Sequence, residues 1–153
     1  MPDREKDGVD LEMFSFENKD RHQKIIVSEE LSNKHIARNI NADPVRQYRI
    51  DGKVIKDKKV QKCDYLVLND EKKTAYFIEL KGKHLLKAKE QLEETYRRVK
   101  GSVAGYEIFY RLVYHTGTQD VDDSQMVKWR QKCGRVGKVD RVQWKQGELT
   151  ENI

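Results

Sequence analysis

The sequence predicts an α/β fold in which a central mixed β-sheet is flanked by helices, and three observations lead to this prediction. Residues 63–68 and 74–81 are apolar, β-rich segments on either side of a polar turn, as expected of a hairpin that is buried on both faces. Residues 84–100 then repeat apolar side chains at helical spacing. Residues 106–115 are again apolar and aromatic, which indicates a third strong strand.

The segment before the hairpin predicts one helix and one short hairpin. A helix is expected over residues 29–40, with Ser28 as its N-cap and acidic residues in its first turn. Residues 41–44 interrupt this pattern. Residues 45–54 alternate loosely and contain the turn dipeptide Asp51-Gly52, which is typical of a short hairpin.

The segment after the hairpin supplies the remaining elements. The helix over residues 84–100 ends at Gly101, and a short helix is expected around residues 124–132. A final strand is expected around residues 139–144. The predicted order is therefore helix, strands, helix, strand, helix, strand. We expect one domain over residues 1–153, in which residues 1–10 are flexible.

The composition excludes several classes of protein. The chain has 153 residues, of which 37% are hydrophobic and 37% are charged, and this fits a single domain with a modest core. It has no apolar run of about 18 residues, so a membrane-spanning helix is excluded. Its polar, mixed-charge start is not a secretory signal, and its two cysteines exclude a disulfide framework or a zinc finger. We therefore expect a cytoplasmic protein that does not associate with membranes.

Positive charge is concentrated near the C-terminal end of the chain. The net charge is +5, and residues 128–145 contain seven basic residues but only one acid, Asp140. Trp129 and Trp144 flank this stretch. Two interpretations remain open: the stretch is a groove that binds nucleic acid, or it is a solvated surface next to two core tryptophans.

The predicted hairpin brings charged side chains into a buried environment, where they are costly unless they are paired or used. Glu79 and Lys81 lie two residues apart in the second strand and therefore share one face. A turn centred between Glu71 and Lys72 pairs residues whose numbers sum to 143, which places Asp64 opposite Glu79. The Cβ atoms of such a pair lie about 5 Å apart.

This arrangement has the chemistry of a phosphodiester-hydrolysis site. Two carboxylates at this separation repel each other unless a proton or a cation lies between them. Oxygen ligands suit Mg²⁺, which keeps several of its waters and accepts one or two carboxylates. Lys81 can orient a metal-bound water and stabilise charge that develops on a phosphate. A Glu-x-Lys sequence in a strand can also be a plain salt-bridged surface pair.

Asp64, a turn and then Glu79-Leu80-Lys81 in an apolar strand resemble the PD-(D/E)xK phosphodiesterase superfamily. The resemblance covers residues 28–115 and implies a restriction-endonuclease-like core with the order α-β-β-β-α-β. It also implies that Asp64, Glu79 and the backbone carbonyl of Leu80 bind the metal, Mg²⁺ or Mn²⁺, and that Lys81 assists the attacking water. The sequence departs from the family pattern at Cys63, where the family has proline.

The resemblance adds two less specific catalytic positions. The helix that follows the lysine strand often supplies a glutamine, which corresponds to Gln91. An acid of the first helix commonly completes the site, and this acid would be Glu29 or Glu30. Helical phase favours Glu29, but an error of one residue in the helix boundary reverses that choice.

We therefore expect a metal-dependent nuclease that acts on DNA and that can form a homodimer. The alternative is a catalytically inactive protein with the nuclease fold that binds nucleic acid or a protein partner, and a third interpretation is an interaction protein that binds no nucleic acid. Ten cations are expected to contact phosphates. They are Lys83, Lys87, Lys89, Lys128, Arg130, Lys132, Arg135, Lys138, Arg141 and Lys145.

Overall fold

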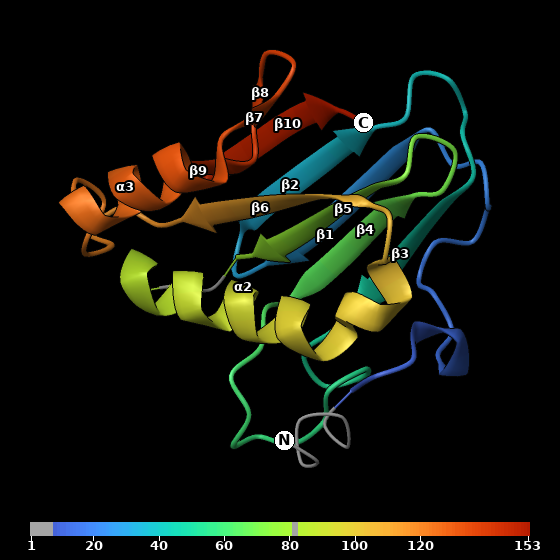
Figure 1. The fold of residues 1–153 in the computed structure, drawn as a ribbon, viewed down its shortest axis with the longest axis horizontal. Coiled ribbons are helices and arrows are strands. Elements are labelled where there is room, and N and C mark those ends of the chain that lie inside the picture. Colours follow the sequence, from blue (N-terminus) through green and yellow to red (C-terminus); the bar gives the residue numbers. More distant parts are fainter. Residues whose placement is uncertain (1–7, 81–82) are drawn as a thin grey trace.

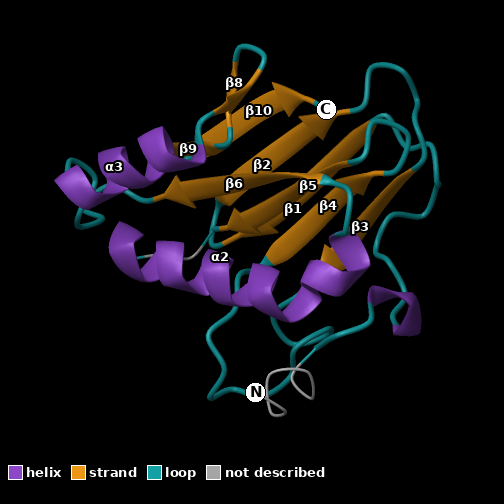
Figure 2. Ribbon diagram, in the orientation of Figure 1, coloured by secondary structure: helices purple, strands orange, loops and turns teal. Residues whose placement is uncertain are grey.

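The computed structural model describes residues 8–80 and 83–153 and has a mixed α/β architecture of three layers (Figures 1 and 2). A five-stranded sheet forms the middle layer, two α-helices cover one of its faces, and a three-stranded sheet covers the other. The elements are, in chain order, η1 (Leu11–Met13), β1 (Ile25–Glu30), β2 (Asn33–Arg38), β3 (Val45–Arg49), β4 (Tyr65–Asn69), β5 (Thr74–Glu79), α2 (Leu85–Val99), η2 (Lys100–Val103), β6 (Glu107–Tyr114), α3 (Ser124–Cys133), β7 (Arg135–Val136), β8 (Val139–Asp140), β9 (Val142–Gln146) and β10 (Glu148–Asn152).

The central sheet has the order β3-β4-β5-β6-β9. β3, β4 and β5 form an antiparallel meander, whereas β5, β6 and β9 are parallel to one another. α2 makes the crossover between β5 and β6, and α3 makes the one between β6 and β9. The predicted hairpin, the helix that follows it, the strand over 106–115 and the short helix near residue 124 are therefore confirmed. Within the described ranges, no helix combines the length and the apolar character needed to cross a membrane.

The helix predicted over residues 29–40 is wrong, because this segment forms the antiparallel hairpin of β1 and β2. Buried residues alternate with more exposed ones along both strands, which is the period of a strand. Leu31 and Ser32 both have positive φ angles and form the two-residue connection between them. The first α-helix of the predicted α-β-β-β-α-β order is therefore absent from the described residues, and the β1–β2 hairpin precedes β3 in its place.

Two smaller differences concern other strands. Residues 45–54 do not form a hairpin of their own, because β3 ends at Arg49 and pairs with β4 instead. β10 was not predicted, and it pairs in parallel with β2 to complete the three-stranded sheet. Of the residues expected to be flexible, 1–7 lie outside the described residues. The N–H of Val9 donates to the carbonyl of Arg98 at 2.7 Å.

The central sheet is apolar on both faces, and this explains its two covering layers. Leu66 and Phe77 belong to the core cluster beneath α2 and α3, whereas Val67 and Ile78 belong to the cluster beneath the three-stranded sheet. Each of these side chains stabilises the fold by about 1.5–3 kcal/mol when it is fully buried. Alternation along β4 and β5 thus fixes which side chains face the helices.

A buried ionic cluster joins the two sheets. Arg111 of β6 is fully buried and forms a bidentate pair with Glu151 of β10, with N–O distances of 2.7 and 3.0 Å. His35 Nε2 lies 2.7 Å from the same carboxylate. Burial alone would raise the pKa of Glu151, but hydrogen bonds from His35 and Arg111 outweigh burial and lower it. Since a buried charge is costly without its partner, this cluster fixes the small sheet against the central one.

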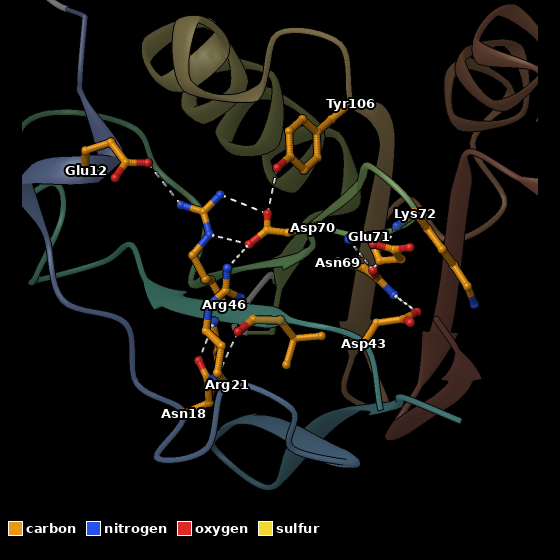
Figure 3. A network of polar contacts seen from close by, with 12 residues as sticks. Glu12, Asn18, Arg21, Asp43, Arg46, Asn69, Asp70, Glu71, Lys72 and Tyr106 are labelled. Atoms are coloured by element: carbon orange, nitrogen blue, oxygen red, sulfur yellow. Dashed lines mark hydrogen bonds and ion pairs between the residues drawn. The ribbon is translucent and has the colours of Figure 1, made fainter. Parts of the chain in front are cut away.

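A second ionic cluster, centred on Asp70 in the β4–β5 turn, joins four separate segments of the chain (Figure 3). Arg46 binds both carboxylate oxygens of Asp70 at 2.8 and 2.9 Å. Arg21 and the hydroxyl of Tyr106 each donate to the carboxylate at 2.6 Å. Burial alone would raise the pKa of Asp70, but the hydrogen bonds from Arg46, Tyr106 and Arg21 lower it overall.

We predict that Asp70→Asn lowers the free energy of unfolding by about 2 kcal/mol at pH 7, because Arg46 and Arg21 lose a charged acceptor. The pKa of Asp70 is depressed in the folded state. Its contribution is therefore present above about pH 4 and is lost as the pH falls through the folded pKa. Urea unfolding at pH 7 and pH 3 measures both effects.

The matched control for this prediction is Glu71→Gln, which removes an exposed carboxylate from the same turn. The control should change stability by less than about 0.5 kcal/mol. An Asp70→Asn variant that is as stable as the wild type at pH 7 would show that the cluster does not stabilise the fold.

Candidate metal and nucleic-acid site

The β4–β5 ladder brings two carboxylates together at one end of the hairpin. Tyr65 pairs with Ile78 and Leu66 pairs with Phe77, which is the predicted register. Asp64 immediately precedes β4, and its N–H donates to the carbonyl of Ile78 at 3.0 Å. Glu79 is the last residue of β5 and shares the face of Phe77, which is the face covered by the helices.

The side chain of Asp64 is fixed against the end of β5. Its Oδ2 accepts a hydrogen bond from the N–H of Leu80 at 2.7 Å. Burial raises the pKa of the neighbouring Cys63 thiol, and the negative charges of Glu79 and Asp64 raise it further. Both carboxylates therefore lie close to Cys63, on the helix side of the sheet.

The pair is buried at the carboxyl end of a parallel strand. Asp64 is 1% exposed and Glu79 is 2% exposed. The carboxyl ends of β5 and β6 lie beside the N-terminal half of α2 (Figure 1). In open α/β sheets, ligands bind at the carboxyl ends of strands. Two adjacent oxygen donors at such a position have the donor chemistry that Mg²⁺ and Mn²⁺ accept.

The third predicted ligand, the carbonyl of Leu80, already has a protein partner. Asn33 of β2 donates its side-chain amide to this carbonyl at 2.7 Å. The same amide lies 3.3 Å from the carbonyl of Val113 and 3.4 Å from His115 Nε2. Because a carbonyl oxygen has two lone pairs, the contact with Asn33 leaves Leu80 able to bind a cation. Sequence reasoning missed Asn33, since it assigned this residue to a helix.

Gln91 lies on α2, in the sequence position that was predicted, whereas Lys81 lies outside the described residues. Gln91 is half-buried on α2 and lies one turn before Thr95, so both side chains are on the same stripe of the helix. The hydroxyl of Thr95 accepts from the N–H of Cys63 at 2.9 Å, next to Asp64. This stripe of α2 therefore faces the start of β4.

The structure does not bring Glu29 or Glu30 to the carboxylate pair. The helix that was expected to carry them is the strand β1, in the sheet that covers the opposite face of the central sheet. Glu29 is exposed and lies 3.7 Å from Lys34. Glu30 pairs with Arg49 of β3 at 2.8 Å. The prediction that Glu29 or Glu30 completes the site from a helix is therefore wrong.

The predicted phosphate-binding cations differ in their surroundings. The exposed lysines are Lys83, Lys87, Lys128, Lys132, Lys138 and Lys145. The cations that pair with acids are Lys89 with Glu93, Arg135 with Asp140, and Arg141 with Glu107. Arg130 differs from both groups, because its guanidinium carbon lies 4.6 Å from the centre of the Trp144 ring. Trp129 is 5% exposed and belongs to the core.

Within residues 8–80 and 83–153, no group of three or more His, Cys, Asp or Glu side chains is placed to hold a metal ion. The candidate site has only two such side chains, Asp64 and Glu79, because its third donor is the backbone carbonyl of Leu80. Compared with known proteins, the chain matches no family model, no curated protein and no solved structure.

We predict that Mn²⁺ raises the Tm of the wild-type protein but not that of Asp64→Asn or Glu79→Gln. A cation that binds only the folded chain stabilises it by about 2.7 kcal/mol at a hundred times its Kd. For a chain of this length, this corresponds to a shift of roughly 5–10 °C in thermal unfolding.

Glu29→Gln is the control for the metal titration, because Glu29 lies on β1 and is exposed. It should keep the full Mn²⁺ response. An equal rise in Tm for Glu79→Gln and for the wild type would place the cation elsewhere.

Proposed function

We propose that this protein is a metal-dependent nuclease that hydrolyses phosphodiester bonds in DNA. The observation that carries the proposal is the contact between Asp64 and the backbone of Leu80, which holds Asp64 beside Glu79 at the carboxyl end of β5. Exposed Lys83 and Lys87 flank the start of α2 next to this end of the sheet. Carboxylates and cations side by side suit a phosphodiester together with its metal ion.

The order of elements supports a restriction-endonuclease-like core. β3, β4 and β5 form an antiparallel meander, α2 follows, and β6 returns parallel to β5. These elements correspond to the β-β-β-α-β part of the order that the family resemblance implies. The β1–β2 hairpin occupies the position of the first helix in that order.

Each residue has a specific role in the proposed reaction. Asp64, Glu79 and the carbonyl of Leu80 would hold Mg²⁺ or Mn²⁺, which supplies a Lewis acid for the attacking water and for the phosphate oxygens. Lys81 would position the attacking water, and Gln91 would reach the site from α2. The exposed lysines bind flanking phosphates without selecting a sequence. Since cutting a duplex requires two such sites, we propose that the active form on duplex DNA is a homodimer.

A second candidate is a nucleic-acid-binding protein that has the same core but no turnover. The hydrogen bond from Asn33 to the Leu80 carbonyl and the nearly complete burial of Asp64 and Glu79 favour it. In that case the contact between Asp64 and the N–H of Leu80 simply closes the end of the hairpin. The two candidates differ in whether DNA is cut.

We predict that the full-length protein cuts DNA in Mn²⁺ or Mg²⁺ and that Glu79→Gln reduces the rate at least about a hundredfold. Affinity for the same DNA should stay within about twofold, since the exposed lysines are intact. Incubation with linear, nicked, branched and single-stranded DNA, with and without metal, measures the rate and identifies the substrate structure.

Glu90→Gln, which removes an exposed acid from α2, is the control and should cut at the wild-type rate. Cleavage by Glu79→Gln at the wild-type rate would show that the site is misassigned. A wild-type protein that binds these DNAs but cuts none of them would favour the second candidate.

A further inference from the structure

Arg130 and Trp144 form a cation–π pair between α3 and β9. The guanidinium carbon of Arg130 lies 4.6 Å from the centre of the Trp144 ring. Both side chains are partly exposed, in contrast to Trp129, which is 5% exposed in the core. A planar guanidinium on an indole presents a flat, cationic surface to any group that approaches it.

Arg130 makes no ion pair with any described residue, although acids hold two other arginines of the same region. Arg135 pairs with Asp140, and Arg141 pairs with Glu107. Lys128 and Lys132 of α3 are exposed and likewise make no ion pair within the described ranges. The positive charge of Arg130 is therefore not compensated by any described residue, which favours an anionic partner. Lys128 and Lys132 are each two residues from Arg130 and lie on a different side of α3.

Trp144 of this pair lies in register with Glu79, one of the two candidate carboxylates. Glu79 pairs with Leu112 across β5 and β6, and Leu112 pairs with Trp144 across β6 and β9. Phe77, Leu112 and Trp144 all contact the core beneath the helices, so Glu79 and Trp144 share one face of the sheet. Two strand spacings separate their backbones by roughly 10 Å. Because Leu112 between them is buried, a DNA strand has to pass around it, and it needs at least about three nucleotides to join the two positions.

We propose that the Arg130–Trp144 pair stacks an unpaired base of the strand whose phosphate lies at Asp64 and Glu79. In a duplex the faces of the bases are covered by their neighbours, whereas an unpaired base offers a free face to an aromatic or guanidinium plane. The protein therefore selects DNA that is single-stranded within a few nucleotides of the cut. The placement of the phosphate rests on the proposed function, but the stacking requires no hydrolysis.

The experiment measures binding without metal, so that no cleavage occurs. Three fluorescein-labelled probes are compared by anisotropy: a 12-nucleotide thymidine strand, the same strand with three central abasic sites, and a 12-base-pair duplex. Stacking of a base on a side chain changes affinity by about tenfold. The wild type should bind the intact strand about tenfold more tightly than the abasic strand.

Arg130→Gln should remove this difference and bind the intact and the abasic strands equally. Arg130→Lys keeps the charge but lacks the guanidinium plane, and it should lose most of the difference while binding the duplex as the wild type does. Lys132→Gln is the matched control on α3, since it removes one exposed charge without changing the stack. It should weaken all three probes by a similar factor and keep the tenfold preference.

Equal wild-type affinity for the intact and abasic strands would overturn the proposal, as would a preference that survives in Arg130→Gln. Failure to bind any of the three probes would also overturn it. Cleavage assays are independent of these outcomes. A protein that binds the intact strand more tightly than the abasic strand but never cuts DNA would support the stacking proposal and contradict the nuclease function. A protein that cuts DNA but binds the intact and abasic strands equally would support the nuclease function and contradict the stacking proposal.

Discussion

The register of the β4–β5 ladder is the constraint on which the candidate site depends. Pairing of Tyr65 with Ile78 sets Asp64 beside the end of β5 and gives Glu79 the same face as Phe77. A slip of one residue would move every side chain of one strand to the other face of the sheet. The two faces of the hairpin are buried under different layers. A slip would therefore move the side chains that pack against the helices to the face of the small sheet, and the reverse.

The layers that cover the sheet are fixed by different physical effects. α2 and α3 pack through apolar side chains, whereas the small sheet is also held by the buried pair of Arg111 with Glu151. The Asp70 cluster holds the opposite end of the meander from the carboxylate pair, since Asp70 follows β4 and Asp64 precedes it. The candidate site therefore lies at the end of the meander from which the chain continues into α2.

Secondary structure could be predicted from the sequence where an apolar pattern was long or where both faces of a strand were apolar. Contacts between residues far apart in the sequence could not be predicted. The β4–β5 hairpin and α2 were predicted because two buried strands and four turns of helix have distinct periods. β1 and β2 are short, and their apolar residues fit a helix almost as well as a strand, so the two-residue turn at Leu31 and Ser32 was missed. The adjacency of Asp64 and Glu79 could be predicted from the register of one hairpin. The contact of Asn33 with Leu80 could not, because it joins segments 47 residues apart.

The claim that Asp64 and Glu79 together bind a divalent cation is tested most directly by X-ray diffraction from crystals grown with Mn²⁺. Anomalous scattering locates manganese without reference to activity. If this claim is correct, an anomalous peak lies within about 2–2.5 Å of an oxygen of each carboxylate, with the Leu80 carbonyl as a further ligand. Manganese bound only elsewhere, with no peak between these two side chains at saturating concentration, would contradict it.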